Sequence, residues 1–236
     1  MLMANLLFSS NFHVYYNIES LSKPKEIREQ VKNYHLLQHK SDDNFLLDPS
    51  PRAHIILIYE NQVDLDNAIA NYINEGLKRG QLCVYASVSL ANEGHLENFS
   101  SQIINYQENV EKGNLVIVDL VSYYVNAMVG NLEYYDKLKE ELISISQRIK
   151  NRTDKCMRLT GDCATLLLKN KHLEECILVE EWWHQNPIEG FILCPYPRSL
   201  LDKFPINAYI SRLIHDHDII VDSNGKLIPE YIQQIK

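Results

Sequence analysis

HIILIY at residues 54–59 is a short apolar run rich in β-branched residues, which is typical of a strand buried on both faces of a sheet. Asp64 then offers a helix N-cap, apolar residues recur at helical spacing, and Gly80 ends the helix. This alternation of strand and helix continues along the rest of the chain. The further predicted strands are residues 82–86, 115–119, 156–160 and 191–194, followed by a weaker one at 219–221.

Segments of helical pattern connect these strands. We predict helices over residues 96–110 and 135–149, a long helix from about Ala164 to Trp183, and a last one near residues 206–215. The prolines at 195 and 197 are expected to end the fifth strand. Strands joined by helix-length connectors form βαβ units. The sequence therefore predicts a three-layer α/β domain, with a mainly parallel sheet and helices on both faces.

The first 51 residues differ from this pattern. They are more polar, residues 24–39 form an amphipathic helix pattern, and Asp48-Pro49-Ser50-Pro51 is typical of a linker. We therefore predict an N-terminal helical extension and linker at residues 1–51 and the α/β domain at residues 52–236. A helix of that length is marginally stable alone, so we expect it to pack on the domain or on a second subunit.

The composition narrows the classes of partner. A net charge of −8 over 236 residues disfavours binding to nucleic-acid phosphates. No run reaches the ~18 consecutive apolar residues of a membrane span, and the N-terminus shows no secretory leader. The five cysteines are odd in number and include no Cys-x-x-Cys pair, which favours reduced thiols over disulfides or a structural zinc site. We expect a cytoplasmic protein that binds neither nucleic acid nor membrane and uses no cofactor.

The turn after the first strand argues against nucleotide hydrolysis. A phosphate-binding turn is rich in glycine and carries a Lys and a Ser or Thr at the start of the helix. The turn here is Tyr59-Glu60-Asn61-Gln62, which has no Gly and no Lys, and its carboxylates together with Asp64 and Asp66 would repel phosphate. Residues 115–119, LVIVD, are similar to the strand whose terminal Asp holds Mg²⁺ in ATPases, but Asp119 more simply caps the end of its strand.

Aromatic and polar side chains gather at the predicted carboxyl ends of the strands, where open α/β sheets bind ligands. Such a mixture suits a small organic ligand better than a polyphosphate, although tyrosines at these positions also serve as half-buried packing. The candidate ligand-binding residues are Tyr59, Glu60, Tyr85, Asp119, Tyr123, Arg158, Asp162, Glu181, Cys194 and Tyr196.

Catalytic and metal sites receive little support from the sequence. His215-Asp216-His217-Asp218 contains metal-binding residue types, but side chains at i and i+2 of a helix point apart, so we predict no metal site. Cys163 follows Gly161-Asp162 near a predicted helix start, where the pKa of a thiol can fall. No catalytic constellation is visible, so an enzyme that uses Asp119, Asp162, Glu181 or Cys163 is the last of our hypotheses.

Several short motifs occur in order along the chain. HIILIYE at 54–60 and EGLKRGQLCVY at 75–85 resemble the opening of the MEDS domain, the sensory domain named after the DcmR regulator of methylotrophs and also found in methanogens. RLTGD at 158–162, the helix with Glu180 and Glu181, and LCPY at 193–196 are similar to later blocks of that family. The resemblance covers about residues 52–222.

The resemblance carries expectations about fold and function. The family is related to RecA/KaiC-type ATPases and lacks their phosphate loop, which implies a RecA/KaiC-like fold without catalysis. It implies that the domain senses a small organic molecule such as a hydrocarbon derivative. Family members often accompany histidine kinases or DNA-binding domains, so the resemblance implies signalling through a partner protein, a histidine kinase or a transcription regulator, or by homodimerisation. The alternative is a degenerate RecA/KaiC-like protein that binds nucleotide or acts as a scaffold.

Overall fold

The computed structural model describes residues 44–49, 52–148, 156–203, 208–228 and 231. All of them belong to the second of two compact units, Asp42–Ile235. The helix predicted at residues 24–39 lies outside the described residues. No helix in the described ranges is long and apolar enough to cross a membrane.

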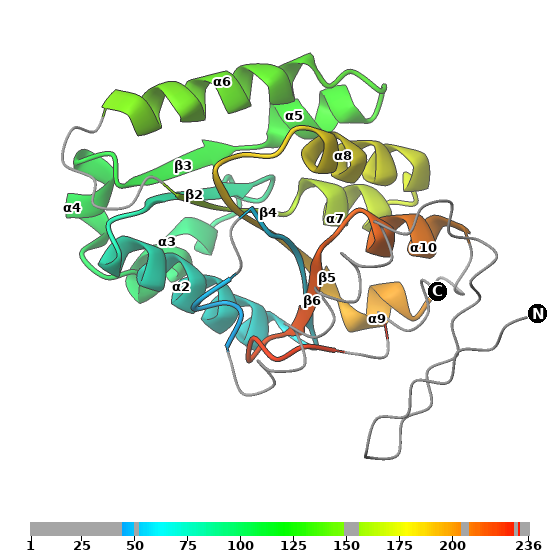
Figure 1. Ribbon diagram of the computed structural model, residues 1–236, viewed down its shortest axis with the longest axis horizontal. Helices are drawn as coiled ribbons and strands as arrows, with labels where there is room; N and C mark the ends of the chain where they lie inside the picture. The colour runs from blue at the N-terminus through cyan, green and yellow to red at the C-terminus, as the bar shows by residue number, and fades with distance from the viewer. Residues whose placement is uncertain (1–43, 50–51, 149–155, 204–207, 229–230, 232–236) are drawn as a thin grey trace, which may run out of the picture. The chain divides into compact units, whose positions relative to one another are not determined.

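Six parallel strands form one sheet, which confirms the predicted α/β class. The spatial order is β3-β2-β4-β5-β1-β6 (Figure 1). Each strand after β1 is therefore reached by a crossover that contains a helix, as parallel pairing requires. The strands are β1 (His54–Tyr59), β2 (Leu82–Ser87), β3 (Leu115–Asp119), β4 (Met157–Gly161), β5 (Gly190–Pro197) and β6 (Ile219–Asp222).

The strand order places Asp119 and Asp162 at different distances from the turn that follows β1. β3 lies at one edge, with three strands between it and β1, so Asp119 is remote from the turn that follows β1. β4, which is followed by Asp162, is separated from β1 by β5 alone. Asp119 is exposed, and its carboxylate accepts a hydrogen bond from the Val121 amide at 2.9 Å. This matches its interpretation as a cap.

Helices α2, α3 and α4 cover one face of the sheet (Figure 1). α2 begins at the N-cap Asn61, whose side chain accepts a hydrogen bond from the Asp64 amide, so the cap lies three positions before the predicted Asp64. The single helix predicted at residues 96–110 is wrong. Asn105 has φ of 44°, a left-handed conformation that Asn tolerates and that divides the segment in two. The bounds are α2 (Gln62–Lys78), α3 (His95–Gln102) and α4 (Tyr106–Glu111).

The other face carries the second group of helices. The long helix predicted from Ala164 to Trp183 is also divided, because Lys171 has φ of 68° and its two parts pack against each other as a helical hairpin. The division produces two shorter helices, α7 and α8, in place of the single long one. The bounds are α5 (Val121–Ala127), α6 (Glu133–Arg148), α7 (Cys163–Lys169), α8 (Leu173–Gln185), α9 (Arg198–Leu201) and α10 (Ala208–His215).

β5 continues through both of its prolines, contrary to the prediction that they end it. Its pairing with β4 stops at Leu193, whereas its pairing with β1 runs on to Pro197. Beyond Leu193 the strand therefore has a ladder partner on one side only. A proline without an N–H is tolerated in such a half-paired stretch, as it is on an edge strand.

Candidate functional site

Asp162 joins the carboxyl ends of β2 and β4. Its carboxylate accepts hydrogen bonds from the Ser87 hydroxyl at 2.6 Å and the Val88 amide at 2.8 Å. Burial raises the pKa of Asp162, and these two donors oppose that rise. Also on β2, the Tyr85 hydroxyl lies 2.8 Å from Nε2 of His95, the first residue of α3. The polar groups at this edge are thus bonded to one another.

The turn between β1 and α2 is closed by its own side chains. Asn61 Nδ2 donates to Asp64, and Gln62 Nε2 donates to Asp66 at 2.7 Å. Glu60 is exposed and forms an ion pair with Arg198 at 2.5 Å. Side-chain amides and carboxylates therefore fill the place where a phosphate-binding loop would present backbone N–H groups. A phosphate group at this turn would meet the carboxylates of Glu60, Asp64 and Asp66.

A cavity of about 30 Å³ lies under α6, α7 and α8, against β2, β4 and β5. Apolar and aromatic side chains form most of its wall, which starts near the carboxyl ends of β2 and β4. The lining residues are Ala86, Leu120, Tyr135, Leu138, Leu159, Gly161, Cys163, Ala164, Val179, Glu180, Trp183, Ile192 and Cys194.

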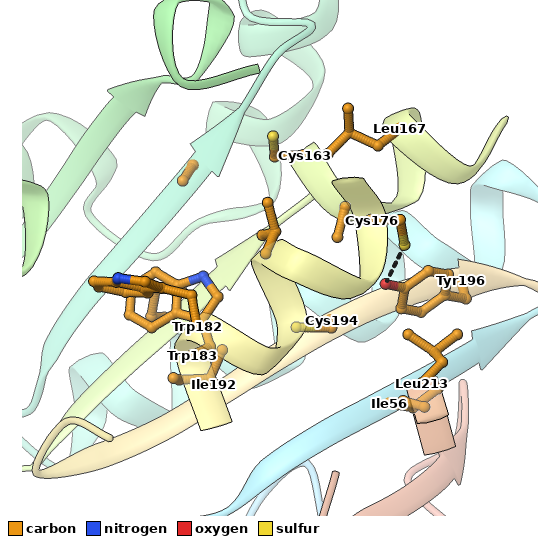
Figure 2. Packing of buried hydrophobic residues seen from close by; sticks show 14 of the residues in the cluster. Ile56, Cys163, Leu167, Cys176, Trp182, Trp183, Ile192, Cys194, Tyr196 and Leu213 are labelled. Atoms are coloured by element: carbon orange, nitrogen blue, oxygen red, sulfur yellow. Dashed lines mark hydrogen bonds between the residues drawn. The ribbon is translucent and has the colours of Figure 1, made fainter. Parts of the chain in front are cut away.

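Aromatic rings surround one end of this cavity. Tyr135 packs against Trp182 and Trp183 with ring centroids 5.6 Å and 6.2 Å away, and the two tryptophans meet edge to face at 4.8 Å. Tyr123 meets Tyr135 edge to face at 5.6 Å. Figure 2 shows the tryptophan pair at one end of α8 and Cys194 on the strand beneath that helix. The cavity is therefore an aromatic-walled pocket inside the core.

Few polar atoms reach the cavity. The Tyr135 hydroxyl donates to Cys163 Sγ at 2.9 Å. Burial raises the pKa of the Cys163 thiol to about 12, although the bond from Tyr135 opposes the rise. Cys163 is therefore a protonated thiol at neutral pH, and burial outweighs the lowering of its pKa that a helix start can cause. A mostly apolar wall with these few polar groups suits a small organic guest.

Glu180 is a fully buried carboxylate at the inner end of the cavity. The Tyr196 hydroxyl donates to one of its oxygens, and Cys194 Sγ lies 3.4 Å from the other. The same second oxygen lies 3.2 Å from His54 Nε2 and 3.5 Å from His217 Nε2. Burial alone raises the pKa of Glu180, but His217 and His54 outweigh it and hold the pKa below its ordinary value. Glu180 is therefore ionised.

The predicted site residues fall into three groups. Cys194 lines the cavity, and Tyr196 and Tyr123 each contact a cavity residue. Tyr59, Tyr85, Glu60 and Asp162 lie at the strand ends; burial and the nearby Asp162 carboxylate raise the pKa of Tyr59 to about 12. Asp119, the last residue of β3, also lies at the strand ends, opposite Ser87 of β2. The remaining two, Arg158 and Glu181, lie away from both places.

Arg158 and Glu181 need correction. The Arg158 side chain lies on the α2 face of the sheet, near the amino end of β4, where its guanidinium donates to the carbonyls of Leu46 and Leu47, each at 2.7 Å. Glu181 points away from the cavity and pairs with Arg212 at 2.5 Å. Its neighbour Glu180 is the residue that reaches the cavity. The residues predicted to form one site are thus divided between the two faces of the sheet.

Sequence reasoning missed most of the cavity wall. The stripe with Tyr135 and Leu138 on α6 was recognised as apolar, and Glu180 and Trp183 were noticed on the later helix. The sequence did not reveal the break at Lys171, which turns α8 so that Glu180 faces β5. The sequence signal that could have found Glu180 is a carboxylate one turn before a tryptophan pair on an otherwise apolar helix.

Residues 53–211 match the family model MEDS, described as "MEthanogen/methylotroph, DcmR Sensory domain". The chain belongs to this family. The match runs from the start of β1 into α10, so it includes the whole cavity wall. No curated protein matches the sequence. Membership of the MEDS family confirms the resemblance given by the short motifs and indicates a sensory role.

Proposed function

We propose that this MEDS domain senses a small, mostly apolar organic molecule, which it binds in the cavity under α6, α7 and α8 without turning it over. The observation that carries the proposal is an aromatic-walled cavity inside a domain of a sensory family. Signalling would then pass to a partner protein, a histidine kinase or a transcription regulator, or to a second copy of the chain.

The size of the cavity limits the ligand. One water molecule needs roughly 10–15 Å³ of such space, so about 30 Å³ accommodates a guest of only a few non-hydrogen atoms. Short alcohols, aldehydes and halogenated hydrocarbons fit this limit. A larger ligand would have to separate α6 from α7 and α8. The cavity therefore favours a one- or two-carbon compound.

The polar groups limit its chemistry. Cys163 is a thiol whose pKa is raised by burial to about 12, so it is not a nucleophilic thiolate at neutral pH. Glu180 already accepts a hydrogen bond from Tyr196. A guest with one weak donor or acceptor suits these groups, whereas an anion would meet the Glu180 charge.

Both tryptophans of the chain lie beside the cavity, which provides a direct test. Tryptophan emission should be recorded while short alcohols, aldehydes and chlorinated hydrocarbons are added, with thermal unfolding measured in parallel. We expect at least one compound to change the emission saturably and to raise the unfolding temperature. Emission and unfolding temperature that stay constant across the whole panel would contradict the proposal.

Gly161→Ala gives a matched variant for the same titration. A Cβ at Gly161 would lie 3.5 Å from Ala86 O and Leu120 Cδ1, which is ordinary contact, so the methyl group fits and occupies part of the cavity. We expect the apparent affinity measured by the fluorescence titration to fall at least about tenfold, because the cavity has space for few atoms. Val129→Ile, which adds one methyl group to a side chain that is 79% exposed, should titrate like the original protein.

A further inference from the structure

Four metal-binding side chains from four separate segments meet beside α8. His54 comes from β1, Glu180 from α8, Cys194 from β5, and His217 from the connection between α10 and β6. All four are buried, and one donor atom from each lies within 4.8 Å of the others. The family match ends at residue 211, so it includes three of these residues and not His217.

The hydrogen bonds around the two histidines fix which nitrogen faces inward. His54 Nδ1 lies 2.8 Å from the Asp216 carbonyl, and His217 Nδ1 lies 2.6 Å from the Leu213 carbonyl. A carbonyl oxygen only accepts, so each Nδ1 is assigned as the N–H donor. In the neutral rings, both Nε2 atoms then present lone pairs to the Glu180 carboxylate. This pattern of an outer carbonyl and an inward Nε2 is characteristic of histidines that bind metals.

The inward-facing atoms need a positive partner. The imidazoles of His54 and His217 are stacked with centroids 3.8 Å apart, and two imidazolium rings at that distance would repel each other in a buried site. His217 Nε2 is within ion-pair distance of Glu180, at 3.5 Å, but lacks hydrogen-bond geometry and finds no other partner among the described residues. Tyr196 already orients the opposite oxygen of Glu180. A cation between these atoms satisfies all of them.

Four of the six separations among the ligand atoms match a tetrahedral ion, and all six are within 4.8 Å. With metal–ligand bonds of about 2.0–2.3 Å, the ligand atoms of a tetrahedron are roughly 3.3–3.8 Å apart. The recorded separations are 3.2 Å between His54 Nε2 and Glu180, 3.3 Å between His54 Nε2 and Cys194 Sγ, 3.4 Å between Cys194 Sγ and Glu180, and 3.5 Å between His217 Nε2 and Glu180. One carboxylate and one thiolate also neutralise a divalent ion.

We propose that His54, Glu180, Cys194 and His217 bind one divalent transition-metal ion, with Zn²⁺ matching the ligand set best. Two imidazoles, one thiolate and one carboxylate form a borderline-soft set, and four protein ligands leave no open position, so the site is structural. The ion links β1, β5, α8 and the connection into β6. Because Glu180 and Cys194 also line the cavity, the ion lies at the inner end of the pocket.

The metal content of the full chain tests the proposal. The protein should be produced in medium supplemented with zinc or, separately, with cobalt, and its metal measured by plasma mass spectrometry. We expect about one equivalent of metal per chain. The cobalt form should show visible bands of a tetrahedral ion and a thiolate-to-cobalt charge-transfer band.

Two matched pairs of variants locate the ion. Cys194→Ser should abolish the charge-transfer band, whereas Cys176→Ser, a buried cysteine whose Sγ lies 3.6 Å from the Tyr196 hydroxyl, should keep it. His217→Gln should lower the metal content at least about tenfold, whereas His184→Gln should not, although His184 bonds to the same Asp216 carbonyl as His54.

The outcomes separate the alternatives. Wild-type protein with less than about a tenth of an equivalent of cobalt overturns the proposal and leaves a protonated hydrogen-bond network at this cluster. A charge-transfer band that survives in Cys194→Ser also overturns it, because the thiolate ligand would then lie elsewhere in the chain. If either variant fails to fold, the band in the cobalt-loaded wild type still decides. None of these results depends on ligand binding in the cavity.

Discussion

Among the described residues, two charged side chains are completely buried, one on each face of the sheet, and their surroundings differ. On the α2 face, the Arg158 guanidinium donates to the carbonyls of Leu46, Leu47 and Tyr72 and to the Gln81 amide oxygen, and stacks over the Tyr72 ring. On the α8 face, Glu180 is surrounded by two imidazoles, a thiol and a phenol.

The difference shows how to distinguish a structural charge from a candidate functional one. The partners of Arg158 are mostly fixed backbone dipoles, which satisfy one charge state and cannot change. The partners of Glu180 are titratable groups that also bind metals, so their protonation and occupancy can change. We therefore assign Arg158 to stability, where it attaches residues 44–49 to the domain, and Glu180 to the site.

The largest effect on stability is expected from Arg158→Met. Methionine keeps much of the apolar stem but leaves the Leu46 and Leu47 carbonyls without their donors. Several unsatisfied buried acceptors, at about 1–3 kcal/mol each, should lower the free energy of unfolding by at least roughly 3 kcal/mol, measured in urea. Arg198→Met, which removes an exposed ion pair with Glu60, should cost less than about 1 kcal/mol. Equal losses in the two variants would break the comparison.

Glu180→Gln should have the next largest effect. The substitution keeps the shape but replaces an ionised acceptor with a neutral amide among two histidines, so we expect a loss of about 2–3 kcal/mol at neutral pH by urea unfolding. Its neighbour supplies the control, because Glu181→Gln removes a partly exposed ion pair with Arg212 and should cost less than about 1 kcal/mol. A larger loss in the Glu181 variant would contradict the assignment of Glu180 to the buried cluster.

The two faces should also respond differently to pH. Burial, and then His217, lower the pKa of His54 below its ordinary value of 6.5, against the influence of Glu180. The unfolded chain therefore binds a proton at His54 before the folded chain does, so stability falls as pH drops below about 6.5. Glu180, whose folded pKa is lowered from 4.5, adds stability that is present above that pH and lost as the pH falls further.

Urea unfolding between about pH 5 and pH 8 measures this response. The wild type should lose roughly 1 kcal/mol per pH unit below pH 6.5, and His54→Gln should flatten that slope. Arg158→Met should shift the whole curve down without changing its slope, because arginine stays charged throughout this range. A metal bound at the cluster would also make stability fall as the pH drops, because protons compete with the ion for the same atoms. A slope that persists in His54→Gln would place the titrating group elsewhere.

The two faces also differ in how much of them the sequence predicted. Strand positions followed from apolar runs such as HIILIY, and the acidic turn after β1 was identified correctly, because both depend on neighbouring residues alone. The cluster at Glu180 depends on residues separated by more than a hundred positions and on the break at Lys171, where a single backbone angle changes which way α8 faces. Arg158 was assigned to the pocket because periodicity does not say which face of a central strand meets which helix.

A pair of glycines, one on each face, gives the smallest and most direct comparison. A Cβ at Gly76 would lie 2.6 Å from Cys83 Sγ and 2.7 Å from Arg158 Cδ, so Gly76→Ala must displace the packed arginine stem. We expect it to lower the free energy of unfolding by about 1–3 kcal/mol despite the better helix propensity of alanine.

On the cavity face, a Cβ at Gly161 meets its nearest atoms at 3.5 Å and enters existing space. Gly161→Ala should therefore be neutral or stabilising by up to roughly 1 kcal/mol, because alanine also restricts the unfolded chain. Thermal and urea unfolding of the two variants side by side measure the difference. The Arg158 face is packed to contact and the Glu180 face retains room for a guest, so a Gly161→Ala variant as unstable as Gly76→Ala would mean that the cavity has no usable space.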